Sequence, residues 1–320
     1  MTNNLSPIVC FAYSRPNHLQ RMLTSLENNY LASESEITFY INGVDKNTNL
    51  EDWNLVIEVA KKNWKFKSID LQIREENIGP KKNILHGISE MFGVHDKLII
   101  IEDDLILGPY FLKFLNESLN IYKNDKNIWH INGWSYPQLI PNRSRSVVSR
   151  YVSPWGWATW DDRWKVMNDE KNFTLNLVSN LPKKERKIFN MGGKVNWEEM
   201  IERDQKGIDN TWDCYWYQAV FLNKSKSIFP LKTHVVNGGF DGTGEHCGNR
   251  EEDYPFDKTY NTKQTTKFSR NTSKLNLYFL INFKIYYIKV SIYNYFKFHK
   301  NKFNSIENFL LFMKKKLYDK

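Results

Sequence analysis

Apolar and polar positions follow one another in the first third of the chain in a way that predicts strands joined by helices. Four short apolar runs are typical of buried strands, and three longer segments with helical spacing separate them. The expected strands are residues 7–13, 37–41, 69–74 and 97–102, and the expected helices are residues 15–28, 50–63 and 81–92. This succession favours an α/β fold with a mostly parallel sheet and flanking helices.

The fourth expected strand, KLIIIE at residues 97–102, has the clearest pattern. Its continuous apolar run predicts a central strand that is buried on both faces, and it ends in the acidic triplet Glu102-Asp103-Asp104. In an open parallel sheet, ligands bind in the crevice beyond the carboxyl ends of the strands. The triplet is therefore the first candidate for a functional site.

The pattern is less regular after residue 105, where aromatic residues become frequent. We expect a helix at 108–122, a strand at 128–132, a polar helix at 181–207 and a strand at 227–236. The glycine-rich segment GGFDGTGEHCG that follows predicts a loop. Nine of the eleven tryptophans lie between Trp129 and Trp216, which is more aromatic surface than a core of this size requires.

The net charge of +9 comes from the end of the chain. Residues 258–320 contain 14 Lys and Arg against 2 Asp and Glu, so the preceding part is slightly acidic. An acidic body argues against nucleic-acid binding, which needs a basic face near the functional elements. Within this basic, aromatic tail, apolar residues recur at helical spacing between 306 and 317, beside lysines 314–316. Such an amphipathic helix either docks on the body or attaches to an anionic membrane surface.

The cysteines and the start of the chain bear on the compartment. Cys10, Cys214 and Cys247 are an odd number without short spacing, which suggests neither a disulfide framework nor a cysteine zinc site. The first residues lack the charged and apolar regions of an export signal, and no apolar run is long enough to span a membrane. We expect a cytoplasmic protein that is at most peripheral on the inner face of the cell membrane.

The acidic triplet can hold a divalent cation. Two carboxylates about 5 Å apart repel each other by roughly 3 kcal/mol at an effective dielectric constant near 20, so a bound cation would relieve a real penalty. Mg²⁺ or Mn²⁺ is the natural candidate, because these ions take one or two carboxylates together with substrate phosphates. The alternative is that Asp103 and Asp104 only cap the helix that follows.

Seven motifs together carry a resemblance to a known family. In chain order they are FAYSRPNHLQRML, INGVDK, ENIGPKKNI, LIIIEDDL, SPWGWATWDDRW, NTWDCYW and VNGGFDGTGEHC. In this order the chain resembles nucleotide-sugar-dependent glycosyltransferases of the GT-A type, such as bacterial sugar transferases, and more remotely the N-acetylglucosaminyltransferase I group. The resemblance covers roughly residues 7–250. It implies a GT-A, Rossmann-like domain over residues 1–257, with a nucleotide half (1–105) and an acceptor half (106–257), before a tail at 258–320.

The resemblance also implies roles for individual residues. Asp104 and His246 would bind the metal, and Glu102 and Asp103 would contact the ribose or sugar of the donor. The nucleotide pocket would be lined by Arg15, Asp45, Asn77 and Gly79, and Asp213 would be the general base. Two departures from the family pattern leave alternatives open, since NGVD replaces the usual D-G-P and Glu245 is a competing metal ligand.

Other residues have an ordinary structural alternative. Asp209 rivals Asp213 as the base, although an apolar setting between tryptophans would raise the pKa of Asp213 usefully. Lys81 and Lys82 either steer a diphosphate or are solvated, and His234 is expected to be structural. We expect Arg163 to pair with its acidic neighbours.

The segment Trp155-Gly156-Trp157 is interpreted as a strand that presents flat aromatic surfaces to a sugar. Sugar rings have apolar CH faces that pack on such surfaces. Part of this tryptophan cluster is also expected to lie in the core.

The predicted function is transfer of a sugar from a nucleotide donor, by analogy UDP-linked, to a hydroxyl group, with inversion of configuration. The acceptor would be a surface polysaccharide or a lipooligosaccharide, either of which can be lipid-linked. Three alternatives are a retaining transferase, a non-catalytic carbohydrate-binding module, and a sugar nucleotidyltransferase. The last normally has a glycine-rich loop after the first strand, where this chain has SRPNHLQR.

Overall fold

The structure is a computed structural model that describes residues 5–136, 146–168, 173–243, 259–272, 281, 283–285 and 288. The chain divides into two compact units, Met1–Asn276 and Leu277–Lys320. The first unit extends beyond the predicted boundary at 257, because described residues between 259 and 272 bond to the body. Ser146 N donates to Lys267 O at 2.8 Å, and Tyr122 Oη donates to Ser269 O at 2.8 Å.

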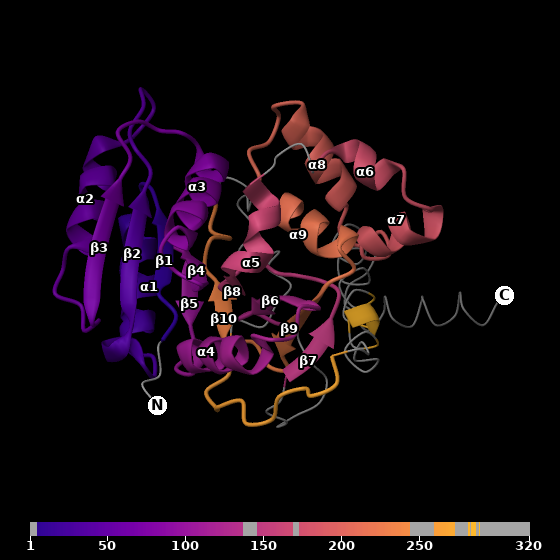
Figure 1. Cartoon of the computed structure of the whole chain (residues 1–320). Helices are drawn as coiled ribbons and strands as arrows, with labels where there is room; N and C mark the ends of the chain where they lie inside the picture. Colours follow the sequence, from indigo (N-terminus) through magenta and orange to yellow (C-terminus); the bar gives the residue numbers. More distant parts are fainter. Residues whose placement is uncertain are drawn as a thin grey trace, which may run out of the picture. The chain divides into compact units, whose positions relative to one another are not determined.

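The first part of the main unit confirms the predicted alternation of strands and helices (Figure 1). Its strands β1 to β4 pair in parallel in the order β3-β2-β1-β4. The elements are β1 (Ile8–Ala12), α1 (Pro16–Glu27), the short 3₁₀ turn Ala32–Glu34, β2 (Glu36–Ile41), α2 (Leu50–Ala60), β3 (Ser68–Ile73), α3 (Pro80–Phe92) and β4 (Lys97–Glu102).

The strand order reverses between β1 and β4, which makes this position a topological switch point. The chain moves outward from β1 through β2 to β3 and then returns across β1 to β4. Because such crossovers are right-handed, α3 lies on the opposite face of the sheet from α1 and α2. In open α/β sheets, ligands bind beyond the carboxyl ends of the strands at such a point, which makes the ends of β1 and β4 the place to look for a site.

The second part of the unit extends the same sheet. The full order is β3-β2-β1-β4-β8-β6-β9-β7, in which β8 and β7 run antiparallel to their neighbours. Strands β5 and β10 form a separate antiparallel ribbon, and α4 packs on β6 and β8. The elements are β5 (Leu105–Leu107), α4 (Phe111–Tyr122), β6 (Ile128–Asn132), β7 (Ser146–Ser149), β8 (Trp157–Trp160), β9 (Lys226–Pro230) and β10 (Val235–Asn237).

Short helices occupy the chain between β8 and β9. They are α5 (Asp161–Trp164), the 3₁₀ turn Lys165–Asn168, α6 (Leu175–Ser179), α7 (Lys183–Phe189), α8 (Trp197–Gln205) and α9 (Asp213–Leu222). The single helix predicted at 181–207 is wrong. Met191, Gly192 and Gly193 all have positive φ, of 51°, 75° and 81°, and this left-handed run ends α7 and separates it from α8.

The strand predicted at 227–236 is also two elements. Strand β9 belongs to the large sheet, whereas β10 pairs with β5, with register Asn237 to Leu105. This second pairing matters for function, because it brings the start of the glycine-rich segment to the end of the acidic triplet.

In the second unit, the described residues 281, 283–285 and 288 are helical. The amphipathic segment predicted at 306–317 lies outside the described residues. Across the part of the chain that the structure describes, no helix has the length and apolar character needed to cross a membrane.

Candidate active site at the switch point

Arg15 and the acidic triplet meet at the switch point. Arg15 follows β1 and caps the start of α1, whose first residue is Pro16, and the triplet follows β4. The Arg15 guanidinium forms an ion pair with Asp103 and a second with Asp104 Oδ2, at 3.2 Å. Asp103 is buried, whereas the side chain of Asp104 is 13% exposed. Asp104 is thus the carboxylate of this pair that a ligand reaches more easily.

Burial and mutual repulsion oppose ionisation in the triplet. Burial, followed by the charges of Asp104 and Asp103, raises the pKa of Glu102 well above its ordinary value. Burial likewise raises the pKa of Asp103, although the Arg15 guanidinium counteracts part of this rise. Arg15 therefore relieves some of the repulsion that the sequence suggested a cation must relieve.

The glycine-rich segment closes over Asp104. Gly238 N donates to the backbone oxygen of Asp104 at 2.7 Å, and a Cβ atom placed on Gly239 would overlap the Asp104 carboxylate. Two residues further on, Asp241 Oδ2 lies 3.0 Å from Nε2 of His18, a buried residue of α1. Glycine is required at 239 because the backbone has to approach the carboxylate this closely.

His246 and Glu245, the predicted and the competing metal ligand of this loop, lie outside the described residues. No group of three His, Cys, Asp or Glu side chains suited to a metal occurs within the described ranges. A magnesium or manganese ion bound with a nucleotide needs only one or two protein carboxylates, because the phosphates complete its shell. Asp104, whose side chain is partly exposed just beyond the carboxyl end of β4, fits that requirement as a single ligand.

The predicted nucleotide residues Asn77 and Asp45 come together beyond β2 and β3. Asn77 Nδ2 donates to Asp45 Oδ2 at 3.0 Å and to Tyr13 Oη at 3.1 Å, and Asn77 Oδ1 accepts from Asn42 Nδ2 at 2.7 Å. The hydrogen bonds that Asp45 accepts, the largest contribution coming from Asn47 N, lower its pKa. Sequence analysis missed Tyr13 and Asn42, although each stands directly at the end of its strand.

Gly79 has a positive φ of 78° and occupies the N-cap position of α3, whose first residue is Pro80. A Cβ atom on Gly79 would lie 2.5 Å from Asn210 Nδ2, so glycine also permits close contact with the segment that precedes α9. This contact joins the nucleotide half to the segment that contains Asp213.

Asp213 is the first residue of α9 and faces the triplet closely enough to raise the pKa of Glu102 further. Its Oδ1 accepts from Thr211 Oγ1 at 2.7 Å and from Cys214 N at 2.9 Å. The rival base Asp209 is bound through both carboxylate oxygens to Arg203, at 2.7 and 2.9 Å. Asp209 is therefore held in a bidentate arginine pair, whereas Asp213 lies near enough to Glu102 to affect its pKa.

Lys81 forms contacts with other residues of the protein, Asp204 and Tyr215. Its Nζ lies 2.5 Å from Oδ2 of Asp204, a nearly buried carboxylate of α8, and 4.2 Å from the centre of the Tyr215 ring. Asp204 also accepts from Thr211 N at 3.0 Å. Lys81 therefore fixes the segment before Asp213, and this pairing competes with the expected role in steering a diphosphate.

Trp155 and Trp157, the two tryptophans predicted to bind a sugar, lie in different environments. Trp157 is wholly buried, so the expectation that it presents a face to a sugar is wrong. It stacks on Trp212 at 5.6 Å and on His130 at 4.9 Å, within the core that supports the start of α9. β8 lies between β4 and β6 and is an interior strand of the sheet.

Trp155 precedes β8 and is half-buried. Gly156 follows it with a positive φ of 64°, which is not a strand conformation. The strand predicted for this segment therefore begins only at Trp157. The Trp155 ring meets the edges of Trp134, at 5.0 Å, and of Phe240, at 5.9 Å. Because Phe240 follows Gly239, this aromatic group lies beside the loop that covers Asp104.

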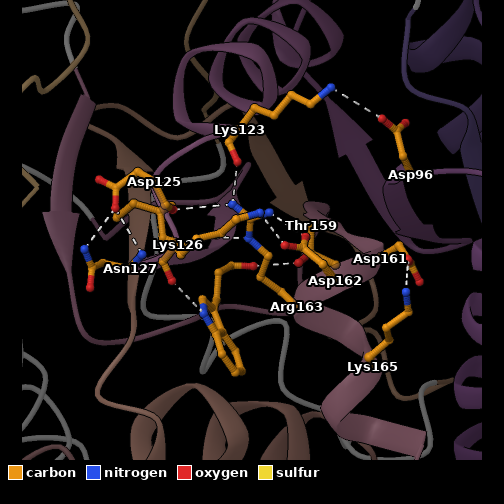
Figure 2. A network of polar contacts seen from close by, with 12 residues as sticks. Asp96, Lys123, Asp125, Lys126, Asn127, Thr159, Asp161, Asp162, Arg163 and Lys165 are labelled. Atoms are coloured by element: carbon orange, nitrogen blue, oxygen red, sulfur yellow. Dashed lines mark hydrogen bonds and ion pairs between the residues drawn. The ribbon is translucent and has the colours of Figure 1, made fainter.

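Two further predictions concern structural residues. His234 is buried, stacks on Phe114 at 5.3 Å, and burial lowers its pKa to about 3, as fits a structural histidine. Arg163 is buried and pairs with Asp162 at 2.5 Å, while Asp161 pairs with Lys165 instead. Figure 2 shows the Arg163 network, in which the guanidinium also donates to Lys123 O at 2.7 Å.

Comparisons with known proteins find only weak similarity. No family model matches the chain. Solved structures with partial similarity include S. aureus TarS 1-349 (TM-score 0.43, 11% identity, 74% of this chain and 61% of that one). A cytidylyltransferase from Leptospira borgpetersenii serovar Hardjo-bovis has a TM-score of 0.32 at 14% identity, over 62% of this chain and 72% of that one.

A UDP-glucose pyrophosphorylase in complex with UDP-glucose has a TM-score of 0.31 at 10% identity, over 52% of this chain and 80% of that one. This chain spans less than two thirds of the length of the TarS fragment. At these scores neither a family nor an activity follows, and function has to be inferred from the residues themselves.

Proposed function

We propose that the protein is a nucleotide-sugar-dependent glycosyltransferase. The observation that carries the proposal is the meeting of Arg15 with Asp103 and Asp104, next to Glu102 in the chain, at the switch point of the sheet. Open α/β sheets bind ligands at this position. A cation beside partly exposed acids is suited to a diphosphate, either directly or through a divalent ion.

The donor would lie across the crevice from β2 to β4. Asn77, Asp45 and Tyr13 offer hydrogen-bond partners for the nucleoside, and uridine is the nucleoside that the family resemblance favours. The diphosphate would then lie near Arg15 and Asp104. A Mg²⁺ or Mn²⁺ ion on Asp104 would supply charge neutralisation for the leaving diphosphate.

Glu102 has a separate role in this proposal. Its raised pKa keeps the carboxyl group protonated to a higher pH than an ordinary glutamate. A protonated carboxyl group can donate a hydrogen bond to a ribose or sugar oxygen as well as accept one. Asp103, buried and paired with Arg15, positions the guanidinium.

Asp213 would act as general base in a single displacement. Its carboxylate takes the proton of an acceptor hydroxyl, the oxygen attacks the anomeric carbon, and the bond to the diphosphate breaks as the nucleoside diphosphate leaves. One displacement inverts the anomeric configuration. The hydrogen bonds from Thr211 and Cys214 hold the Asp213 carboxylate in a fixed orientation.

The acceptor in this proposal is a surface glycan or a lipid-linked glycan. Trp155 and Phe240 form an aromatic pair beside the loop over Asp104, where a sugar ring can pack on an apolar surface. The basic, aromatic tail is suited to the anionic membrane surface on which a lipid-linked acceptor would lie.

The test is a calorimetric screen of UDP-, GDP- and dTDP-sugars with and without Mn²⁺, using the full chain and two matched variants. Asp104→Asn removes a carboxylate at the carboxyl end of β4, and Asp96→Asn removes an exposed one just before its amino end. We expect donor affinity to fall at least 10-fold in Asp104→Asn and to remain unchanged in Asp96→Asn.

Product analysis separates the proposal from its alternatives. Release of a nucleoside diphosphate supports a glycosyltransferase, and NMR of the product anomer tests inversion. Formation of pyrophosphate from a nucleoside triphosphate and a sugar phosphate would replace the proposal by a nucleotidyltransferase. Binding of free sugars without any nucleotide affinity would replace it by a carbohydrate-binding module.

A further inference from the structure

A second concave site lies in the acceptor half, beside the carboxyl end of α9. It is a surface cavity of about 280 Å³ between α7, the end of α9 and the start of β9. The donor crevice is at the other end of α9, which has 10 residues and is therefore about 15 Å long. The cavity is lined by Arg150, Glu185, Ile188, Phe221, Lys224, Ser225 and Lys226.

The lining combines positive charge with an apolar wall. Arg150, Lys224 and Lys226 face a single acid, Glu185, so the cavity has an excess of two positive charges. Within the described residues, neither Arg150 nor Lys224 forms an ion pair with a carboxylate. Lys226 Nζ donates to Thr272 O at 2.7 Å, which fixes the third cation in place.

The apolar wall consists of Ile188 from α7 and Phe221 from α9, both half-buried. Phe221 is held by its edge against Phe189, at 5.1 Å between ring centres. A ligand that filled this cavity would thus meet charge on one side and a fixed aromatic and aliphatic surface on the other.

Lys224 occupies a backbone position at which glycine is favoured. Its φ is 53°, and its N–H donates to Phe221 O at 2.9 Å where the chain leaves α9. A residue with a side chain is strained in this left-handed conformation. The sequence nevertheless has lysine here, which places an ammonium group at the mouth of the cavity.

We propose that this cavity binds a phosphate monoester whose organic part packs on Phe221 and Ile188. The excess of two positive charges matches the dianion, and the Arg150 guanidinium suits the oxygens of a phosphate. The volume accommodates a phosphate together with one small ring. The proposal is independent of the donor site, since none of its residues contacts the acidic triplet among the interactions that the structure describes.

The test measures binding of phenyl phosphate, inorganic phosphate and benzoate by NMR titration at low salt. We expect phenyl phosphate to bind about 10-fold more tightly than inorganic phosphate, because the ring packs on Phe221. Benzoate, with one charge, should bind about 10-fold more weakly than phenyl phosphate. Equal affinities for all three ligands would overturn the proposal.

Two variants locate the site. Arg150→Gln should weaken phenyl phosphate binding about 10-fold, and Lys224→Gly should weaken it about fivefold. Glycine suits the left-handed conformation at this position, so we expect Lys224→Gly to remain folded, and its melting temperature checks this. Lys184→Gln, on α7 outside the cavity, makes the same change of charge as a control.

The outcomes distinguish this site from the donor crevice and from a lipid surface. Binding that persists at full strength in both cavity variants and disappears in Asp104→Asn would place the phosphate in the donor crevice and overturn the proposal. Vesicles of phosphatidylglycerol are a second arm. Cavity-dependent binding to vesicles, with none to phenyl phosphate, would overturn the proposal in favour of a membrane contact.

Discussion

Two arginines at opposite ends of the large sheet show how the same side chain serves different purposes. Arg163 lies near the amino ends of β4 and β6, where it binds Asp162 and backbone oxygens of Lys123 and Ile128 (Figure 2). Arg15 lies at the carboxyl ends of β1 and β4, and its guanidinium binds the carboxylates of Asp103 and Asp104. Its side chain is 22% exposed, against 3% for Arg163.

The acids beside these arginines have pKa values shifted in opposite directions. Near Arg163, burial is outweighed by Lys126 and by Arg163 itself, and the pKa of Asp162 is lowered. Near Arg15, burial prevails and the pKa values of Glu102 and Asp103 are raised. At the amino ends of the strands, the ion pair stabilises the charged form of Asp162. At the carboxyl ends, the charged forms of Glu102 and Asp103 are disfavoured, and a bound cation would stabilise them.

The largest effect is expected on stability, when Arg163 at the amino ends of the strands is replaced. Arg163→Met should lower the free energy of unfolding by about 4 kcal/mol, because it leaves a carboxylate and backbone oxygens without their buried donor. Urea unfolding measures this. Arg203→Met removes an exposed arginine from its acid and serves as the control, with little change expected. Equal stability of both variants would show that the Arg163 network contributes little.

Replacing Arg15 should affect the binding of the nucleotide sugar more than the stability of the fold. Arg15→Met should weaken nucleotide-sugar binding about 100-fold, because a charge-assisted contact to the diphosphate is lost. It also leaves Asp103 buried without its partner. The double variant Arg15→Met with Asp103→Asn should therefore regain thermal stability without regaining affinity, as calorimetry and a melting curve would show. Recovery of both would mean that Arg15 only stabilises the fold.

A steric change sharpens the comparison without altering charge. Gly239→Ala places a methyl group against the Asp104 carboxylate and should weaken donor binding about 10-fold. Gly93→Ala, at the end of α3 where φ is −63°, provides the matched control. If both variants bind the donor as well as the native protein does, Asp104 has no part in binding.

The smallest effect concerns pH. Since the pKa of Glu102 is raised on folding, its stabilising contribution is complete below about pH 4 and is lost as the pH rises through the raised value. In Glu102→Gln the side chain cannot ionise, so this loss of stability at high pH does not occur. Its melting temperature should exceed that of the native protein by a few degrees at pH 8, and the two should agree at pH 4. A difference that is constant with pH would contradict the assignment.

The elements of the nucleotide half could be predicted because the patterns that mark them are local in sequence. Apolar runs and helical spacing place β1 to β4 and their helices. The chemistry of the triplet could be predicted in kind, but the pairing with Arg15 could not, because it depends on side-chain geometry at the strand ends.

The acceptor half was predicted less well because its sequence pattern is less regular and its strands do not follow a repeated strand–helix order. Nothing local indicates that β8 enters the sheet between β4 and β6, or that β10 pairs with β5. Trp157 was misplaced for this reason, since a tryptophan run looks the same in sequence whether a strand is covered or open. The break between α7 and α8 had a visible signal in Gly192-Gly193, which the polar pattern of residues 181–207 concealed.

The antiparallel insertion of β8 has a consequence for any attempt to divide the protein. β8 pairs along β4 from Lys97 to Ile100 and is contributed by residues more than fifty positions later. A fragment that stops near residue 105 would leave one side of its most apolar strand without a neighbour, and such an edge recruits other copies. We expect the fragment to precipitate during expression and to become soluble only when the segment that contains β8 is supplied with it.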